Sequence, residues 1–155
     1  MLEVGDPVPV FQAESGGGGT VAAAGLLGSR WVIYFYPKDK TPGCTVETRE
    51  FGQELPRFRA AGITLYGCST GGVQAKRDFA RACGAPDLPL LADPDHSIAE
   101  GFGVWGERRF MGKTYLGVLR TTFLVGADGR VEHVWEGVEP TGHAAEVLAA
   151  ARGSS

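Results

Sequence analysis

Short apolar runs and stretches with apolar residues at helical spacing follow one another along the first half of the chain. The run 31–36 is continuously apolar and rich in β-branched and aromatic residues, which is typical of a strand buried on both faces of a parallel-type sheet. Residues 63–69 are interpreted as a second buried strand. Between them, apolar residues recur at approximately helical spacing, and Gly62 marks the end of the predicted helix. These residues are Val46, Phe51, Leu55 and Phe58.

The second half of the chain predicts further short elements. The expected helices are 73–83, 97–102 and 141–151, and the expected strands are 88–91, 119–125 and 130–135. The last two strands flank Gly126-Ala-Asp-Gly129, which is a hairpin turn signal. Ala144, Ala145, Val147 and Leu148 are placed on or near the inner face of the last helix, and residues 103–117 are expected to form a loop. The order of elements is compatible with an α/β sandwich around a mixed sheet.

The first thirty residues contain four consecutive glycines within the segment 15–20. Such a segment has a high ordering entropy and no side chain to bury, so we interpret it as a hairpin-like loop after a short strand near 8–11. A phosphate-binding loop is the alternative, but the Gly-Lys-Ser/Thr ending of such loops is missing. Residues 22–27 are expected to form a short helical turn.

Composition adds limits on the class of protein. The 155 residues suit one domain, 1–155, and 43% hydrophobic with 21% charged residues is ordinary for a globular chain. A formal net charge of −3 and the absence of a basic run argue against nucleic acid as a partner. No run resembles a signal peptide or a membrane span, so a cytoplasmic location without membrane attachment is expected.

The three cysteines, Cys44, Cys68 and Cys83, are an odd number without the spacing of a secreted disulfide framework or a zinc site. Free or catalytic thiols fit better, and no metal or cofactor is expected. Cys68 ends a predicted central strand and is interpreted as a core residue. The histidines do not indicate another mechanism.

Cys44 has an environment that favours a reactive thiol. It follows Thr41-Pro42-Gly43, a turn with a plausible helix N-cap, and therefore lies in the first turn of the predicted helix. Amide N–H groups there lack intrahelical partners and lie at the positive end of the helix dipole. In such places the pKa of a cysteine can fall from about 8.5 to about 3.5–7.5, and the thiolate is the nucleophile. The alternative for Cys44 is a small buried apolar residue.

The residues around Cys44 also carry a family resemblance. Pro37-x-x-x-Thr41-x-x-Cys44 resembles the active-site signature of the peroxiredoxins. Tyr34-Phe-Tyr-Pro-Lys with Thr-Pro-Gly-Cys-Thr is similar to the peroxiredoxin Q branch, also called bacterioferritin comigratory protein. The resemblance extends over nearly the whole chain. Further segments that resemble blocks of the family are Val4-Gly5-Asp6-x-x-Pro9-x-Phe11, 101–106, 110–115 and 120–129.

The resemblance implies a thioredoxin-like fold, in which a central mixed β-sheet is flanked by helices, and reduction of hydrogen peroxide and organic hydroperoxides. By resemblance, Cys44 is the peroxidatic thiolate that becomes a sulfenic acid. Thr41, Arg120 and backbone N–H groups near Cys44 would donate hydrogen bonds to the reacting oxygens. Pro37 would shape the loop and shield the thiolate from water.

The chain lacks the usual resolving cysteine of the branch, which is the second cysteine that forms a disulfide with the oxidised peroxidatic one. Many relatives carry it at the position that Arg49 occupies here, and others carry it in the next helix, about one turn before Cys83. We expect Cys83 to resolve Cys44 as an intramolecular disulfide, with a packing role on the helical face of Phe79 as the alternative. A one-cysteine enzyme recycled by an external thiol stays open. Thioredoxin or a similar dithiol protein is the expected reductant, and a monomer the expected state.

Two other functions are compatible with a thioredoxin-like chain. A thiol-disulfide oxidoreductase usually carries Cys-x-x-Cys, which is absent because Thr45, Val46 and Glu47 follow Cys44. A non-catalytic binding or chaperone module is the other, because a fold does not fix a function.

Overall fold

A mixed sheet of five strands lies at the centre of the computed structural model, which describes residues 1–153. The strand order is β5-β4-β3-β8-β9. Strands β3, β4 and β5 run parallel, whereas β8 is antiparallel to both β3 and β9. The strands are β3 (Arg30–Phe35), β4 (Ile63–Ser69), β5 (Leu90–Ala92), β8 (Thr121–Val125) and β9 (Val131–Glu136). The predicted α/β fold with a central mixed sheet is confirmed.

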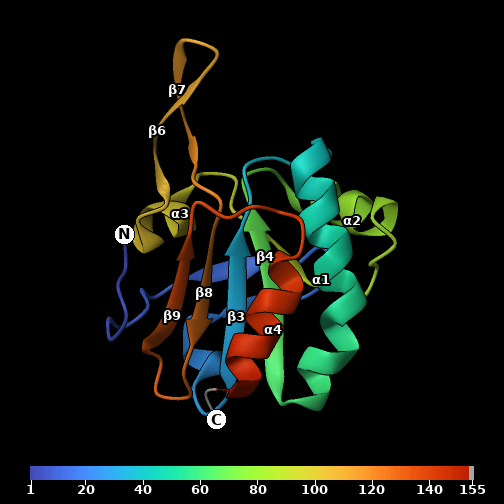
Figure 1. Cartoon of the computed structure of the whole chain (residues 1–155), viewed down its shortest axis with the longest axis vertical. Helices are drawn as coiled ribbons and strands as arrows, with labels where there is room; N and C mark the ends of the chain where they lie inside the picture. Colours follow the sequence, from blue (N-terminus) through green and yellow to red (C-terminus); the bar gives the residue numbers. More distant parts are fainter. Residues whose placement is uncertain (154–155) are drawn as a thin grey trace.

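Four α-helices of the described chain surround this sheet. They are α1 (Pro42–Ala60), α2 (Val73–Ala82), α3 (Ser97–Phe102) and α4 (His143–Gly153). Figure 1 shows α1 and α4 side by side in front of the sheet. Helix α1 ends where predicted, because Gly62 takes a φ of 75° and its N–H donates to the Arg59 carbonyl at 3.0 Å.

The core is divided by the sheet into two clusters, and β3 contributes to both. Val32 and Tyr34 belong to the cluster that includes residues of α1, α2 and α4, whereas Trp31, Ile33 and Phe35 belong to the cluster with α3 and the N-terminal segment. All five side chains are buried. A strand covered on both faces needs apolar residues at every position, which explains the continuous run in the sequence.

The glycine-rich segment forms the expected hairpin loop. Strands β1 (Gln12–Glu14) and β2 (Thr20–Ala22) pair antiparallel on either side of it, and the 3₁₀ helix η1 (Ala23–Leu26) follows. The first strand therefore begins after the apolar residues at 8–11 rather than among them.

The expectation of a loop at 103–117 is wrong. Strands β6 (Trp105–Phe110) and β7 (Lys113–Val118) form an antiparallel hairpin that extends away from the body of the molecule (Figure 1). Both central residues of its turn have positive φ, 51° at Met111 and 77° at Gly112, as a type I′ turn requires. Because the ribbon lies mostly in solvent, its strands do not need the alternation of apolar residues by which a half-buried strand is recognised.

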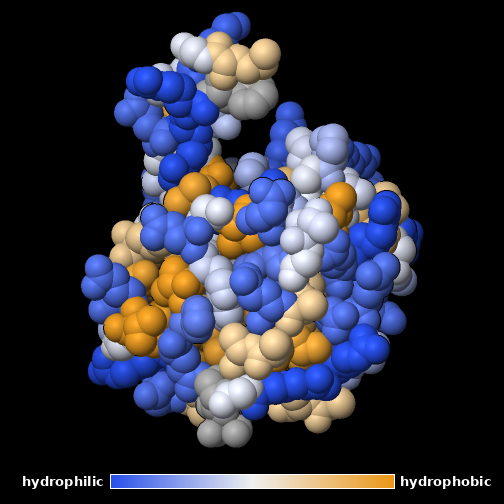
Figure 2. Space-filling view, viewed as in Figure 1, coloured by the Kyte–Doolittle hydropathy of each residue, from blue (hydrophilic) through white to orange (hydrophobic). Residues whose placement is uncertain are grey.

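Smaller differences concern where elements begin and end. Strand β5 is 90–92 rather than 88–91, and α4 begins at His143 rather than at 141. Ala145 is exposed, whereas its neighbour Ala144 is buried as predicted. Figure 2 shows hydrophilic residues over much of the projecting hairpin, with hydrophobic residues in smaller groups near its base. Across residues 1–153, no helix has the length and apolar character needed to cross a membrane.

Phe51 offers a test of how α1 is held against the sheet. Its ring stacks on Tyr34 with centroids 4.3 Å apart and is fully buried. We expect Phe51→Ala to lower the free energy of unfolding by about 3–5 kcal/mol, because it removes this contact and leaves a cavity. The exposed Gln53 of the same helix is the matched control, and Gln53→Ala should change stability by less than about 0.5 kcal/mol. Equal losses in urea titrations of the two variants would contradict the packing argument.

Candidate active site

The segment between β3 and α1 places Cys44 in the first turn of the helix. Thr41 is the N-cap by position, with extended backbone, and Pro42 follows at the start of the helix, where its missing N–H costs no hydrogen bond. The N–H and hydroxyl of Thr45 both donate to the Thr41 carbonyl, at 2.9 and 2.8 Å. The Thr41 hydroxyl does not cap the helix but donates to the Lys38 carbonyl at 2.8 Å.

Arg120 reaches the sulfur of Cys44 from the segment that precedes β8. Its Nη2 lies 3.4 Å from Cys44 Sγ, and its Nη1 donates to Glu47 Oε1 at 2.7 Å. The Arg120 carbonyl accepts from the Val138 N–H at 2.9 Å, which fixes the backbone beneath the guanidinium. A Cβ at Gly43 would lie 3.2 Å from Nη2, so glycine leaves room for the guanidinium to approach the helix.

Glu47 is a site residue that the sequence reasoning missed. It lies one turn after Cys44 on α1, its side chain is fully buried, and it forms an ion pair with Arg120. Burial raises the pKa of its carboxyl from 4.5 to about 7, and the charge and hydrogen bond of Arg120 oppose that rise. Its second oxygen, Oε2, has no hydrogen-bond partner among the described residues. The signal available in the sequence was an acidic residue three positions after the reactive cysteine on one helical face.

The guanidinium of Arg120 is mostly buried. Burial lowers the pKa of Arg120, but the charges of Glu47 and Cys44 and their hydrogen bonds outweigh it, so the net shift is upward. Arg120 is therefore a permanent cation that contacts both the carboxylate and the sulfur. The guanidinium and the first-turn amides of α1 thus place positive charge beside Sγ.

Cys83 lies at the C-cap of α2 and is not bonded to Cys44. It is buried and belongs to the same hydrophobic cluster as Cys44 and Tyr34. Burial raises the pKa of its thiol, while the positive charge of Arg49 opposes the rise. Arg49 itself is exposed. Cys44 and Cys83 thus lie in one core cluster, but their sulfurs are not bonded to each other.

The other predicted residues have simpler surroundings. Cys68 is fully buried in the cluster on the opposite face of the sheet, where burial raises the pKa of its thiol. Pro37 is half-buried and follows directly after the buried Tyr36. His143 is buried with Nε2 2.8 Å from the Thr122 hydroxyl, and burial lowers its pKa. Across the described part of the chain, no group of three or more His, Cys, Asp or Glu residues has the arrangement to hold a metal ion.

Glu47 gives the site a testable pH dependence. A carboxyl whose pKa is raised by folding stabilises the protein below its unfolded value, 4.5, and this stability is lost as the pH rises through about 7. We expect the stability of the wild type to fall over this range, relative to Glu47→Gln, by at most about 1.4 kcal/mol per pH unit. Urea unfolding at several pH values measures it. Glu54→Gln, at a partly exposed position of α1, is the control, and parallel curves for Glu47→Gln and wild type would refute the assignment.

Comparisons with known proteins agree with the geometry. Residues 4–134 match the model of the AhpC/TSA family. The chain is 40% identical over 147 residues to peroxiredoxin Bcp of Escherichia coli K12, covering 95% of this chain and 94% of that protein. It is 37% identical to a putative peroxiredoxin of Mycobacterium tuberculosis H37Rv, covering 94% and 92%.

Solved structures resemble the chain in fold as well. Xanthomonas campestris peroxiredoxin Q has a TM-score of 0.86 at 38% identity, covering 92% of this chain and 90% of that one. A cysteine mutant of Xylella fastidiosa PrxQ has a TM-score of 0.92 at 30% identity, covering 99% and 98%. With a buried thiol, a guanidinium against its sulfur and these relatives along nearly its whole length, the chain belongs to the AhpC/TSA family as a peroxiredoxin of the Bcp/PrxQ type, a thiol peroxidase.

Proposed function

We propose that Cys44 is the peroxidatic cysteine of this thiol peroxidase. The observation that carries the proposal is the contact of Arg120 Nη2 with Cys44 Sγ at 3.4 Å, in the first turn of a helix. A permanent cation and the unpaired first-turn amides favour the thiolate, which is the nucleophilic form. Cys68 lies in the other core cluster, and Cys83 in a setting where burial raises its pKa, so neither has a comparable environment.

The proposed reaction transfers one oxygen atom to sulfur. The thiolate of Cys44 attacks one peroxide oxygen, the O–O bond breaks, and the electron pair leaves with the distal oxygen. That oxygen takes up a proton and departs as water or an alcohol, while the sulfur is oxidised to a sulfenic acid. Negative charge spreads over both oxygens in the transition state, so fixed donors beside Sγ lower the barrier. Arg120 and the amides of Gly43 and Cys44 supply such donors.

Thr41 and Pro37 complete the proposed site by family resemblance. The Thr41 hydroxyl donates its hydrogen bond to the Lys38 carbonyl, so its oxygen can accept a hydrogen bond from a hydroperoxide. This role differs from the donor role expected from the sequence, and it orients the substrate rather than stabilising its charge. Pro37 restricts the backbone that leads from β3 into the site and limits access of water.

Resolution by Cys83 is the second part of the proposal. The Cys83 thiolate attacks the sulfenic sulfur, a disulfide forms, and the hydroxyl leaves as water after taking up a proton. A disulfide needs Cα atoms about 4.4–6.8 Å apart, and we expect the first turn of α1 to unwind to bring Cys44 and Cys83 to that separation. Cys44 and Cys83 belong to the same hydrophobic cluster, which supports this pairing. Because both are buried, we expect the structure around them to open locally after the sulfenic acid forms and before the disulfide forms.

A peroxiredoxin acts on hydroperoxides with a thiol reductant. We propose hydrogen peroxide and organic hydroperoxides as substrates and thioredoxin or a similar dithiol protein as the reductant, with a cytoplasmic, monomeric enzyme of one domain, 1–155. A solved structure of the Xanthomonas campestris bacterioferritin comigratory protein, 35% identical, concerns alkyl peroxide reduction by that protein. A one-cysteine enzyme that an external thiol reduces directly is the alternative.

The role of Cys44 predicts the effect of three substitutions on peroxide consumption with excess dithiol. Cys44→Ser should abolish turnover, and Arg120→Met should lower kcat/KM for the peroxide by about 100- to 1,000-fold, as loss of a transition-state donor does. Cys68→Ala, a buried thiol on the other face of the sheet, is the matched control and should retain the wild-type rate. Turnover that survives Cys44→Ser in a folded protein would exclude the assignment.

The role of Cys83 predicts a disulfide after oxidation. Wild type treated with one equivalent of peroxide should give a Cys44–Cys83 crosslinked peptide in mass spectrometry, and Cys83→Ser should accumulate sulfenic acid instead. If Cys83 stays open to alkylation after unfolding while wild-type Cys44 holds a stable sulfenic acid, the one-cysteine alternative is correct.

A further inference from the structure

An ion pair outside the reacting groups anchors the segment that leads into the site. Lys76 of α2 is fully buried, and its Nζ lies 2.7 Å from Asp39 Oδ2 and 2.7 Å from the Thr70 carbonyl oxygen. The other carboxylate oxygen, Asp39 Oδ1, accepts from the Tyr36 hydroxyl at 2.6 Å. A buried ammonium persists only when it is paired, so the position of Asp39 is tightly linked to that of Lys76.

Asp39 lies in the middle of the active-site loop, defined here as residues 36–41. On one side of it Tyr36 ends the buried run of β3, and on the other Lys40 takes a φ of 66°, a conformation that residues other than glycine rarely adopt. The strain at Lys40 has to be held in place by its surroundings. Asp39 and the Thr41 hydroxyl bond supply that restraint immediately before and after it.

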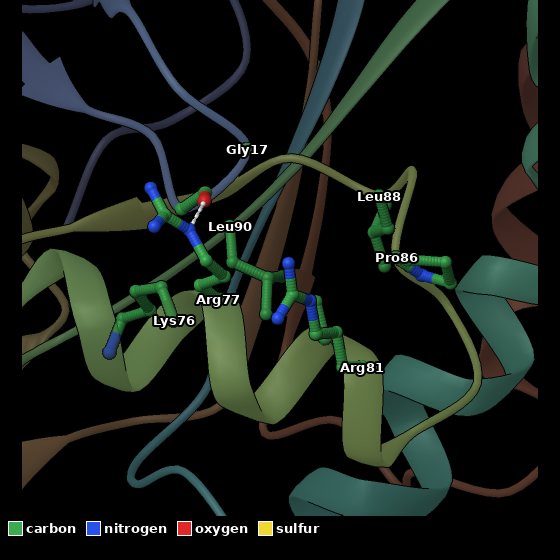
Figure 3. Close-up of a pocket in the computed structure, with 9 residues that line it drawn as sticks. Gly17, Lys76, Arg77, Arg81, Pro86, Leu88 and Leu90 are labelled. Carbon is green, nitrogen blue, oxygen red and sulfur yellow. Dashed lines mark hydrogen bonds between the residues drawn. The ribbon is translucent and has the colours of Figure 1, made fainter.

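The same helix is attached to a second loop by the next residue along it. Arg77 Nε donates to the Gly16 carbonyl at 2.9 Å, and Figure 3 shows Arg77 extending toward the glycine-rich loop while Lys76 points away from it. A Cβ at Gly16 would lie 2.8 Å from the Arg77 backbone nitrogen, so that loop packs closely on α2. The hollow between them, about 330 Å³, contains none of the five predicted site residues. Arg77 is therefore a matched cation without a link to the active-site loop.

We propose that Lys76 is a positioning residue for the peroxide reaction. It holds Asp39, and through it the active-site loop, in the closed arrangement where Arg120 contacts Cys44. Resolution has the opposite requirement, because the fully buried Cys44 must emerge before any thiol reaches it. The pair thus favours the state that reacts with peroxide over the state that reacts with thiols. This inference rests on the proposed role of Cys44 but not on that of Cys83.

Rapid-quench kinetics on the full chain separate the two steps. All variants are compared in a Cys83→Ser background, where only the added dithiothreitol removes the sulfenic acid. There, Lys76→Met should slow sulfenic acid formation at Cys44 about tenfold, because the site is loosened, and should accelerate the loss of the sulfenic acid under fixed dithiothreitol. Asp39→Asn should act in the same two directions, and the double variant should resemble either single one, because the two residues act as one unit. Arg77→Met should leave both steps within about twofold of wild type, since its loop lies elsewhere.

The possible failures are distinct. Three results would overturn the positioning role. They are equal slowing of both steps, effects on the rates that multiply in the double variant, and no change of either rate in Lys76→Met. Should Lys76→Met fail to fold by circular dichroism, the double variant Asp39→Asn with Lys76→Met leaves no unpaired buried charge and decides the question by the same two rates. Absence of sulfenic acid at Cys44 in the Cys83→Ser background would instead refute the proposed role of Cys44.

Discussion

The site depends on one buried cation, the guanidinium of Arg120. Its Nη1 donates to the Glu47 carboxylate and its Nη2 contacts the Cys44 sulfur, and the ion pair with Glu47 offsets part of the cost of burying the guanidinium. Removing Arg120 would leave the Glu47 carboxyl without its ion-pair partner in a place that water reaches poorly. Burial raises the pKa of Glu47 to about 7, and the guanidinium of Arg120 opposes that rise.

The sheet brings these groups together. Phe35 of β3 is paired with Thr121 of β8, so the residue before Thr121 necessarily lies beside the segment that follows Phe35. That residue is Arg120, and the segment is the one that ends at Cys44. The antiparallel pairing of two strands far apart in the sequence therefore determines which side chain meets the sulfur. The core residues on both faces of β3 then hold this register against slippage, because a shift by one residue would exchange the two faces.

Much of this could be predicted from the sequence, and the rest has identifiable reasons for failure. The apolar run of β3, the turn chemistry before Cys44 and the spacing along α1 are local signals, and each led to the correct element. The family resemblance supplied Arg120, whose approach to Cys44 depends on strand pairing that periodicity leaves undetermined. Glu47 and the Asp39–Lys76 pair were missed because charged residues on a helix or in a loop usually face solvent. The hairpin β6–β7 was missed because its strands bury little.

That hairpin has a practical consequence for handling the protein. Its turn at Met111 and Gly112 extends away from both core clusters, and none of the contacts that hold Arg120, Cys44 and Glu47 passes through it. An epitope or a fluorescent reporter inserted between these two residues would lengthen a solvent-exposed ribbon at a small entropic cost. The turn thus offers an attachment point for a label or a surface outside both core clusters.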